Sequence, residues 1–240
     1  MQNSEKLKIK IFSDGANLNS IKELHKNPFI EGFTTNPTLM NKANIKDYKK
    51  FAIDALKIVQ DRPISFEVFS DDFYEMEKQA EQIASWGENV YVKIPITNTK
   101  KEDTGPLVKR LSMLGVKVNV TALMTVKQVD HILKYLSKDT PSCISVFAGR
   151  IADTGRDPVP IMKEAVKLMK IMPKSELIWA SPRELLNIFQ ANTIGCHIIT
   201  VTNELLTKLS LVGKNLEEYS LETVQMFYSD ALQSKFSIEY

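Results

Sequence analysis

Short apolar runs and segments of helical periodicity alternate along most of the chain. Eight runs rich in β-branched and aromatic residues cover 8–13, 32–35, 64–69, 90–96, 117–123, 143–147, 176–180 and 196–201. Apolar residues at helical spacing fill segments between them, at 45–59, 72–86, 104–114, 125–136, 158–172 and 182–192. Strands that alternate with helices in this way indicate repeated βα units around a parallel sheet.

Eight such units in 240 residues predict an α/β fold, the (β/α)8 TIM barrel, which usually takes about 250 residues. An open, doubly wound parallel sheet is the alternative. After the eighth strand, residues 204–211 supply the eighth helix, and 216–236 carry a further apolar stripe at helical spacing with Ser220 as the predicted N-cap. We therefore expect one barrel domain over 1–240, with an additional C-terminal helix in 214–240 that buries its stripe on the barrel or on a neighbouring subunit.

Three consecutive predicted strands have one apolar and one polar face. Side chains on a strand alternate between its two faces, and the positions between the apolar ones carry Glu67, Lys93, Asn119 and Thr121. If the apolar faces pack on the outer helices, these four side chains point into one barrel interior. Such burial is costly for stability alone, so the pattern favours a barrel with a functional interior.

Lys93 is the most informative of these residues. An inward position removes water from the ammonium group, lowers its pKa and makes the neutral amine available as a Schiff-base nucleophile. A lysine on an exposed strand edge, or in a buried ion pair with Glu67, explains the pattern about equally well. Glu67 in turn is either the structural partner of Lys93 or a general acid/base.

Further polar residues lie at the carboxyl ends of predicted strands, where barrel active sites form. A turn or cap is the ordinary role of an aspartate such as Asp14, and a surface ion pair is that of each arginine taken singly. Two arginines on late loops are also typical of a bidentate phosphate clamp. The residues at these strand ends are Asp14, Thr34, Asn36, Ser145, Phe147, Arg150, Ser181 and Arg183.

Composition excludes several other classes of function. With 31 basic and 29 acidic residues, the chain has no charge surplus for nucleic acid or an anionic membrane surface. We find neither a secretory signal nor an apolar run of the roughly 20 residues that span a bilayer, and expect a cytoplasmic protein with Cys143 and Cys196 as buried thiols. His25, His131 and His197 lack metal-ligand spacing, and no glycine-rich nucleotide loop is present, so neither a metal nor a cofactor is expected.

Taken together, the motifs resemble the transaldolases, in particular the short, single-domain, fructose-6-phosphate-aldolase-like branch. The resemblance covers nearly the whole chain, and its most specific strings are Thr-Thr-Asn-Pro and Lys-Ile-Pro in this order. It rests on Asp14, on 34–38, on Glu67, on 92–95, on 119–121, on Ser145 with Gly149 and Arg150, and on 180–183.

The resemblance implies a class I aldolase mechanism without a cofactor. Lys93 would form the Schiff base and carry a dihydroxyacetone unit, Asp14 would move the proton of the C4 hydroxyl, and Glu67 would shuttle protons with a water held by Thr121. The residues implied in substrate binding are Asn36, Asn119 and Ser145 for the three-carbon unit, Arg150, Ser181 and Arg183 for the phosphate, with Thr34 and Phe147 beside them.

Phe147 and Glu67 bear on whether the three-carbon unit is transferred or released. In the aldolases of this family that release free dihydroxyacetone, the positions that match Phe147 and Glu67 look like Tyr and Gln. The resemblance therefore implies transfer between phosphorylated sugars, as in the pentose phosphate pathway. Release, an inactive sugar-phosphate-binding barrel and a barrel isomerase are the alternatives. Gly15 and Glu184 depart from the family pattern and leave the acceptor open. Similar proteins form rings, so we also expect a homo-oligomer, a pentamer or decamer, in which the last helix contacts a neighbour.

Overall fold

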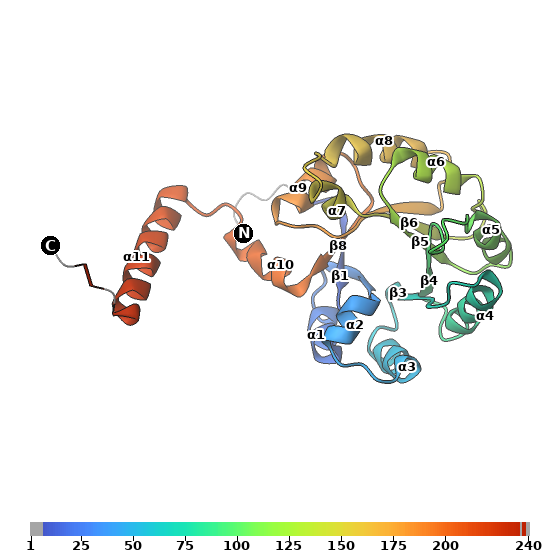
Figure 1. The fold of residues 1–240 in the computed structure, drawn as a ribbon, viewed down its shortest axis with the longest axis horizontal. Helices are drawn as coiled ribbons and strands as arrows, with labels where there is room; N and C mark the ends of the chain where they lie inside the picture. Colours follow the sequence, from blue (N-terminus) through green and yellow to red (C-terminus); the bar gives the residue numbers. More distant parts are fainter. Residues whose placement is uncertain (1–6, 236, 239–240) are drawn as a thin grey trace.

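The computed structural model describes residues 7–235 and 237–238, and its eight parallel strands close into a barrel surrounded by helices (Figure 1). Each strand pairs with the next one along the chain, and the last pairs with the first. The predicted TIM barrel is confirmed, and the open doubly wound sheet is excluded. The strands are β1 (Lys10–Asp14), β2 (Ile30–Thr34), β3 (Ile64–Glu67), β4 (Val90–Pro95), β5 (Val118–Leu123), β6 (Ser142–Val146), β7 (Ser175–Trp179) and β8 (Ile198–Thr202).

Six of the helices coincide with the segments that the periodicity predicts. These are α3 (Tyr48–Ile58), α4 (Phe73–Ala84), α5 (Gly105–Met113), α6 (Val126–Leu133), α8 (Val159–Met169) and α9 (Leu186–Thr193). The pattern does not single out α1 (Leu18–His25), α2 (Pro37–Lys42) or α7 (Ala148–Ala152). The last two have six and five residues, fewer than two helical turns, so no apolar period can be read from them.

The barrel wall separates two apolar regions. Val92 and Ile94 on β4 are fully buried in the large core between the strands and the helices, as the alternating pattern predicts. A smaller cluster of strand residues fills the interior and includes Phe12, Cys143 and Ile198. The ring of Phe12 lies where a β-carbon on Gly32 would stand, so glycine at position 32 makes room for it.

Strand β2 ends before its neighbour β3 does. It pairs with β3 only at Phe33↔Ile64 and Thr34↔Ser65, whereas the β3–β4 pairing continues to Glu67↔Lys93. The chain leaves the sheet because Asn36 caps α2 through a bond from the Leu39 N–H and is followed by proline at the first helical position. The edge of β3 that faces β2 therefore has no strand partner beyond Ser65.

The segment after β8 differs in detail from the expectation. Residues 203–211 form α10 (Asn203–Thr207) and a 3-10 turn, η1 (Lys208–Leu211), and α11 (Leu216–Ser234) follows. The predicted cap at Ser220 is wrong: Asn215 caps α11, because its side chain accepts the N–H groups of Glu217 and Glu218 one turn earlier. The predicted end of this segment at Phe236 lies outside the described residues.

Helix α11 extends away from the barrel (Figure 1). None of its described residues is buried, and Val224, Phe227 and Leu232 on its apolar stripe are each about three-fifths exposed. The apolar stripe of α11 is therefore not buried against its own barrel. No helix within the described part of the chain is both long enough and apolar enough to cross a membrane.

Candidate active site

Lys93 and Glu67 meet inside the barrel near the carboxyl ends of β4 and β3. They are direct neighbours in the strand register, and the Lys93 Nζ lies 3.1 Å from the Glu67 Oε2. Lys93 is only 6% exposed, and its Nζ also donates to the carbonyl oxygen of Thr35 at 2.7 Å. The exposed-edge alternative for Lys93 is therefore excluded, and the lysine is a buried ion-pair partner of Glu67 with one further acceptor.

Asp14 ends β1 at the same mouth of the barrel. Its carboxylate accepts the Thr34 hydroxyl at 2.8 Å and the Asn36 amide at 3.2 Å, and the Thr34 hydroxyl also contacts Thr200 on β8. Burial raises the pKa of Asp14 above its usual value, while the charge of Lys93 and the two hydrogen bonds oppose this shift. Helix α1 is capped by Asn17, so Asp14 is not an ordinary capping aspartate.

Asn119 and Ser145 form a buried polar chain across neighbouring strands. The Ser145 hydroxyl donates to the Asn119 Oδ1 at 2.7 Å, and the Asn119 amide donates to the Ser65 hydroxyl at 3.1 Å. These bonds fix the amide orientation of Asn119 inside the barrel. Ser65 and Thr200 belong to this polar interior but were missed as site residues, although both alternate with apolar neighbours on their strands.

Thr121 is 2% exposed, and its hydroxyl has no hydrogen-bond partner among the described residues. A buried hydroxyl without a partner is costly unless a water or a ligand satisfies it. The strand bulges directly after it, with a register shift between Val120 and Leu123 and a left-handed Ala122 at φ 65°. The buried Thr121 hydroxyl therefore lies next to a local kink in β5.

The two arginines predicted as a clamp differ in their surroundings. Arg183 is bound by Asp153, with its Nε 2.9 Å from one carboxylate oxygen and its Nη2 against the other. The Arg183 guanidinium lowers the pKa of the Asp153 carboxyl. Arg150 is exposed, lies 5.7 Å from the ring centroid of Phe147, and has no ion-pair partner in the described ranges. Arg150 is therefore open to an anion, whereas Arg183 is already paired on one side.

Helix α7, which carries Arg150, touches the loop that carries Arg183. A β-carbon at position 149 would lie 1.5 Å from the carbonyl oxygen of Ser181, so no residue but glycine fits there without a backbone shift. Ser181 itself adopts the left-handed conformation at φ 60°, which is uncommon for a serine. Helix α7 and the loop after β7 are thus packed backbone to backbone at the candidate phosphate site.

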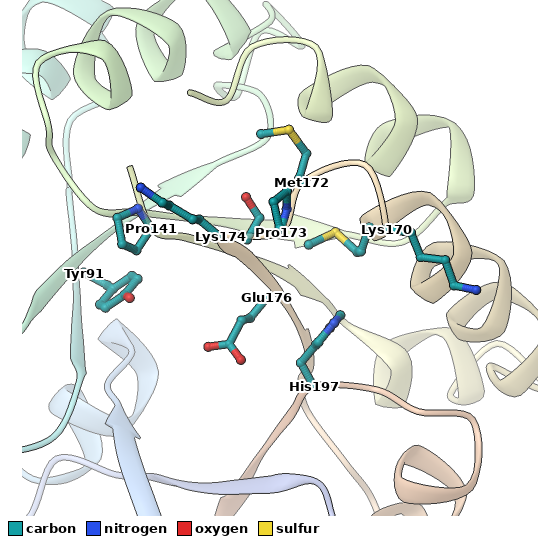
Figure 2. Close-up of a pocket in the computed structure, with 10 residues that line it drawn as sticks. Tyr91, Pro141, Lys170, Met172, Pro173, Lys174, Glu176 and His197 are labelled. Carbon is teal, nitrogen blue, oxygen red and sulfur yellow. The ribbon is translucent and has the colours of Figure 1, made fainter. Parts of the chain in front are cut away.

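A separate cavity of about 370 Å³ lies at the amino ends of the strands, away from these residues. Figure 2 shows the Glu176 carboxylate between Tyr91 and His197 in this cavity. Glu176 pairs with Lys10 at 2.9 Å, and the His197 Nδ1 accepts the N–H of Leu177. None of the predicted site residues lines it. Across residues 7–235 and 237–238, no group of three or more metal-ligating side chains is found.

Comparisons with known proteins agree on fold and family. Residues 11–238 match the family model described as Transaldolase/Fructose-6-phosphate aldolase. A probable transaldolase of Dehalococcoides mccartyi is 35% identical over 202 residues, which are 84% of this chain and 90% of that protein. A probable transaldolase of Streptococcus agalactiae is 33% identical over 216 residues, 90% of this chain and 95% of that one.

Solved structures resemble the chain in fold alone. A structure described as native KDPGal has a TM-score of 0.55 at 13% identity and covers 97% of this chain and 100% of its own. The tryptophan synthase alpha subunit of Campylobacter jejuni has a TM-score of 0.54 at 13% identity, over 82% of this chain and 87% of its own. At such low identity these similarities support the barrel architecture alone and give no indication of activity.

Proposed function

The chain belongs to the transaldolase/fructose-6-phosphate aldolase family, and from this premise we propose that it is a transaldolase that transfers a dihydroxyacetone unit between phosphorylated sugars through a Schiff base on Lys93. The observation that carries the proposal is the buried contact between Lys93 and Glu67, at the same barrel mouth as Asp14. Its relatives of about one-third identity are named probable transaldolases, which supports transfer over release.

In the first half of the reaction, Lys93 and Glu67 exchange a proton. The Glu67 carboxylate, 3.1 Å from the Lys93 Nζ, accepts the ammonium proton, and the neutral amine attacks the ketose carbonyl. Glu67 then returns a proton to the hydroxyl of the resulting carbinolamine, which leaves as water and gives the iminium. The unpartnered Thr121 hydroxyl is suited to hold that water.

In the second half, Asp14 acts on the sugar hydroxyl. Its carboxylate removes the C4 hydroxyl proton, the C3–C4 bond breaks, and the electron pair moves to the iminium to give an enamine on Lys93. Burial raises the pKa of Asp14, which makes it a stronger base and lets it return the proton to the acceptor aldehyde. Asn36, Asn119 and Ser145 bind the hydroxyls of the retained unit.

In this proposal, helix α7 and the loop after β7 bind the phosphate group. Arg150 is exposed and contributes its guanidinium N–H groups, with its Cζ 5.7 Å from the centroid of the Phe147 ring. Arg183 contributes the N–H groups that Asp153 does not occupy, and Ser181 contributes its hydroxyl. One open and one half-occupied arginine favour a single terminal phosphate group.

We expect sugar turnover to depend on an acceptor. With fructose 6-phosphate alone, the enamine is retained because Phe147 has no hydroxyl to bring water to the iminium; with erythrose 4-phosphate added, the rate should rise at least about tenfold. The measurement is a coupled assay for glyceraldehyde 3-phosphate, with free dihydroxyacetone followed in parallel.

The matched control for this assay is Phe147→Tyr, which keeps the ring and adds the hydroxyl, and should raise dihydroxyacetone release. Equal rates with and without acceptor, accompanied by stoichiometric dihydroxyacetone, would identify the wild type as an aldolase that releases its ketone. The Phe147 argument for transfer would then be wrong, whereas the Schiff-base mechanism would stand.

Helix α11 is proposed to pack against a neighbouring copy of the chain, in a ring-shaped homo-oligomer of five or ten subunits. The support is its apolar stripe, which is exposed along its described length, together with the family resemblance. Helices of this kind need a partner to bury such a stripe. We further propose that the reaction belongs to cytoplasmic sugar-phosphate metabolism, in the pentose phosphate pathway.

Removal of 214–240 should lower the mass of the assembly in solution. The truncated chain retains all eight strands and every proposed site residue, so the barrel is expected to stay folded. Sedimentation velocity measures the mass, and circular dichroism checks the fold. Phe227→Asp, which places a charge on the stripe in the full chain, should have the same effect. An unchanged oligomer in both variants contradicts the assignment of α11.

A further inference from the structure

The backbone of Glu67 has a partner that no strand provides. Strand β2 ends at Thr34, and its last contacts with β3 are the bonds of the Thr35 N–H and hydroxyl to the Ser65 carbonyl. Glu67 lies two residues further along the uncovered edge of β3. Its N–H and C=O would stay unpaired there, and leaving a partly buried backbone group without a hydrogen bond destabilises the fold.

Tyr48, the first residue of α3, supplies both missing bonds. Its hydroxyl accepts the Glu67 N–H at 2.8 Å and donates to the Glu67 C=O at 2.9 Å. One hydroxyl therefore does what a neighbouring strand does at other positions. Nineteen residues separate Tyr48 from Glu67, so this is a tertiary contact and not a local turn.

The ring of Tyr48 is held in place by aromatic neighbours. It meets Phe69 at 4.5 Å, Trp86 at 5.7 Å and Phe66 at 6.3 Å between centroids, each edge to face. Burial raises the pKa of the Tyr48 hydroxyl, so it stays protonated and able to donate. The hydroxyl is thus fixed in position and in protonation state.

We propose that Tyr48 is a positioning residue for Glu67: it anchors the backbone from which the Glu67 carboxylate reaches the Lys93 Nζ. The inference rests on the proposed Schiff-base function, because it concerns the group that exchanges protons with Lys93. Glu67 is the last residue of a four-residue strand, and among the described residues only Tyr48 bonds its backbone on the β2 side. Proton transfer depends on that position, because it requires hydrogen-bond distance between donor and acceptor.

The test is Tyr48→Phe, which keeps the ring and deletes the hydroxyl. We expect kcat of transfer from fructose 6-phosphate to erythrose 4-phosphate to fall about ten- to a hundredfold, with KM changed less than about threefold. The rate of borohydride trapping should fall in parallel. The matched control is Phe69→Leu, which removes the nearest aromatic contact of Tyr48 but leaves both hydrogen bonds, and should retain most of kcat.

A double-mutant cycle separates positioning from general loss of structure. In a Glu67→Gln background, Tyr48→Phe should cause little further loss of kcat, because Tyr48 acts through the carboxylate that is already gone. An equal loss in both backgrounds, or wild-type kcat in Tyr48→Phe, overturns the proposal. If the wild type itself forms no trapped adduct, the proposed function fails instead, so the two failures are distinguishable. Circular dichroism of each variant checks folding.

Discussion

Lys93→Met should abolish covalent trapping and lower kcat/KM by at least about three orders of magnitude. Borohydride reduction in the presence of fructose 6-phosphate is expected to add the mass of one reduced three-carbon unit to the wild-type chain, at Lys93. The reason is that only an amine can form the iminium that borohydride reduces. Methionine matches the length of the lysine stem but provides no nucleophile. Intact-mass and peptide mass spectrometry are the measurements.

Lys10→Met is the matched control for this experiment. Lys10 also lies on a barrel strand and pairs with a carboxylate, Glu176 at 2.9 Å, but at the amino end of the barrel. This variant should keep both the adduct and the activity. Since the Glu67 carboxylate loses its partner in Lys93→Met, circular dichroism must show that the variant is folded. A wild type that binds sugar phosphate but never forms an adduct would support the inactive-barrel alternative.

Asp14→Asn should lower the rate of carbon–carbon cleavage by about two to four orders of magnitude, the usual contribution of a general acid/base. Schiff-base formation precedes the step assigned to Asp14, so the borohydride adduct on Lys93 should still form. Loss of both trapping and turnover would contradict this division of roles. The measurements are steady-state transfer and trapping on the same preparation.

The same substitution should raise the free energy of unfolding at neutral pH. Burial raises the pKa of Asp14 in the folded state, so the folded chain binds this proton more tightly than the unfolded chain. The stability that this group provides is complete below its unfolded pKa, about 3.9, and is lost as pH rises through the folded pKa. Asparagine carries no such dependence and keeps the oxygen that accepts the Thr34 hydroxyl.

Asp153→Asn is the control of opposite sign. Arg183 lowers the pKa of Asp153, so that carboxylate stabilises the fold above its unfolded pKa, and its removal should slightly reduce stability at neutral pH. Urea unfolding at pH 5 and pH 8 measures both effects. A destabilised Asp14→Asn at pH 8 would show that its loss of the Asn36 bond outweighs the relief of the buried charge.

The barrel interior could be predicted because it depends on local rules. Side chains alternate along a strand, and consecutive strands of a barrel are neighbours, so the pattern around Glu67, Lys93 and Asn119 was sufficient to bring them together. The Thr35 carbonyl that accepts from Lys93 carries no such signal, since every residue has a carbonyl oxygen. Its role depends on where the chain leaves β2.

Other features depend on contacts between distant segments. Asp153 binds Arg183 across 30 residues of sequence, and Tyr48 binds Glu67 from a helix whose amphipathic pattern indicates only which face is buried. Neither partner has a periodicity that connects it with the other. The sequence pattern did not indicate α2 and α7, and it misplaced the N-cap of α11, which is Asn215. The reason is simpler here: short helices and single caps contain too few residues for a pattern.

The contact between Gly149 and Ser181 has a dynamic consequence. Helix α7 and the loop after β7 are joined there backbone to backbone and again through the Asp153–Arg183 pair, so we expect a displacement of one to displace the other. We therefore expect Arg150 and Arg183 to move together, so that in the proposed function a phosphate bound by either arginine restrains both segments. We therefore expect little independent motion of these two segments, and in the proposed transfer reaction we expect adaptation to acceptors of different length to occur on the opposite side of the barrel mouth, around β2 and β3.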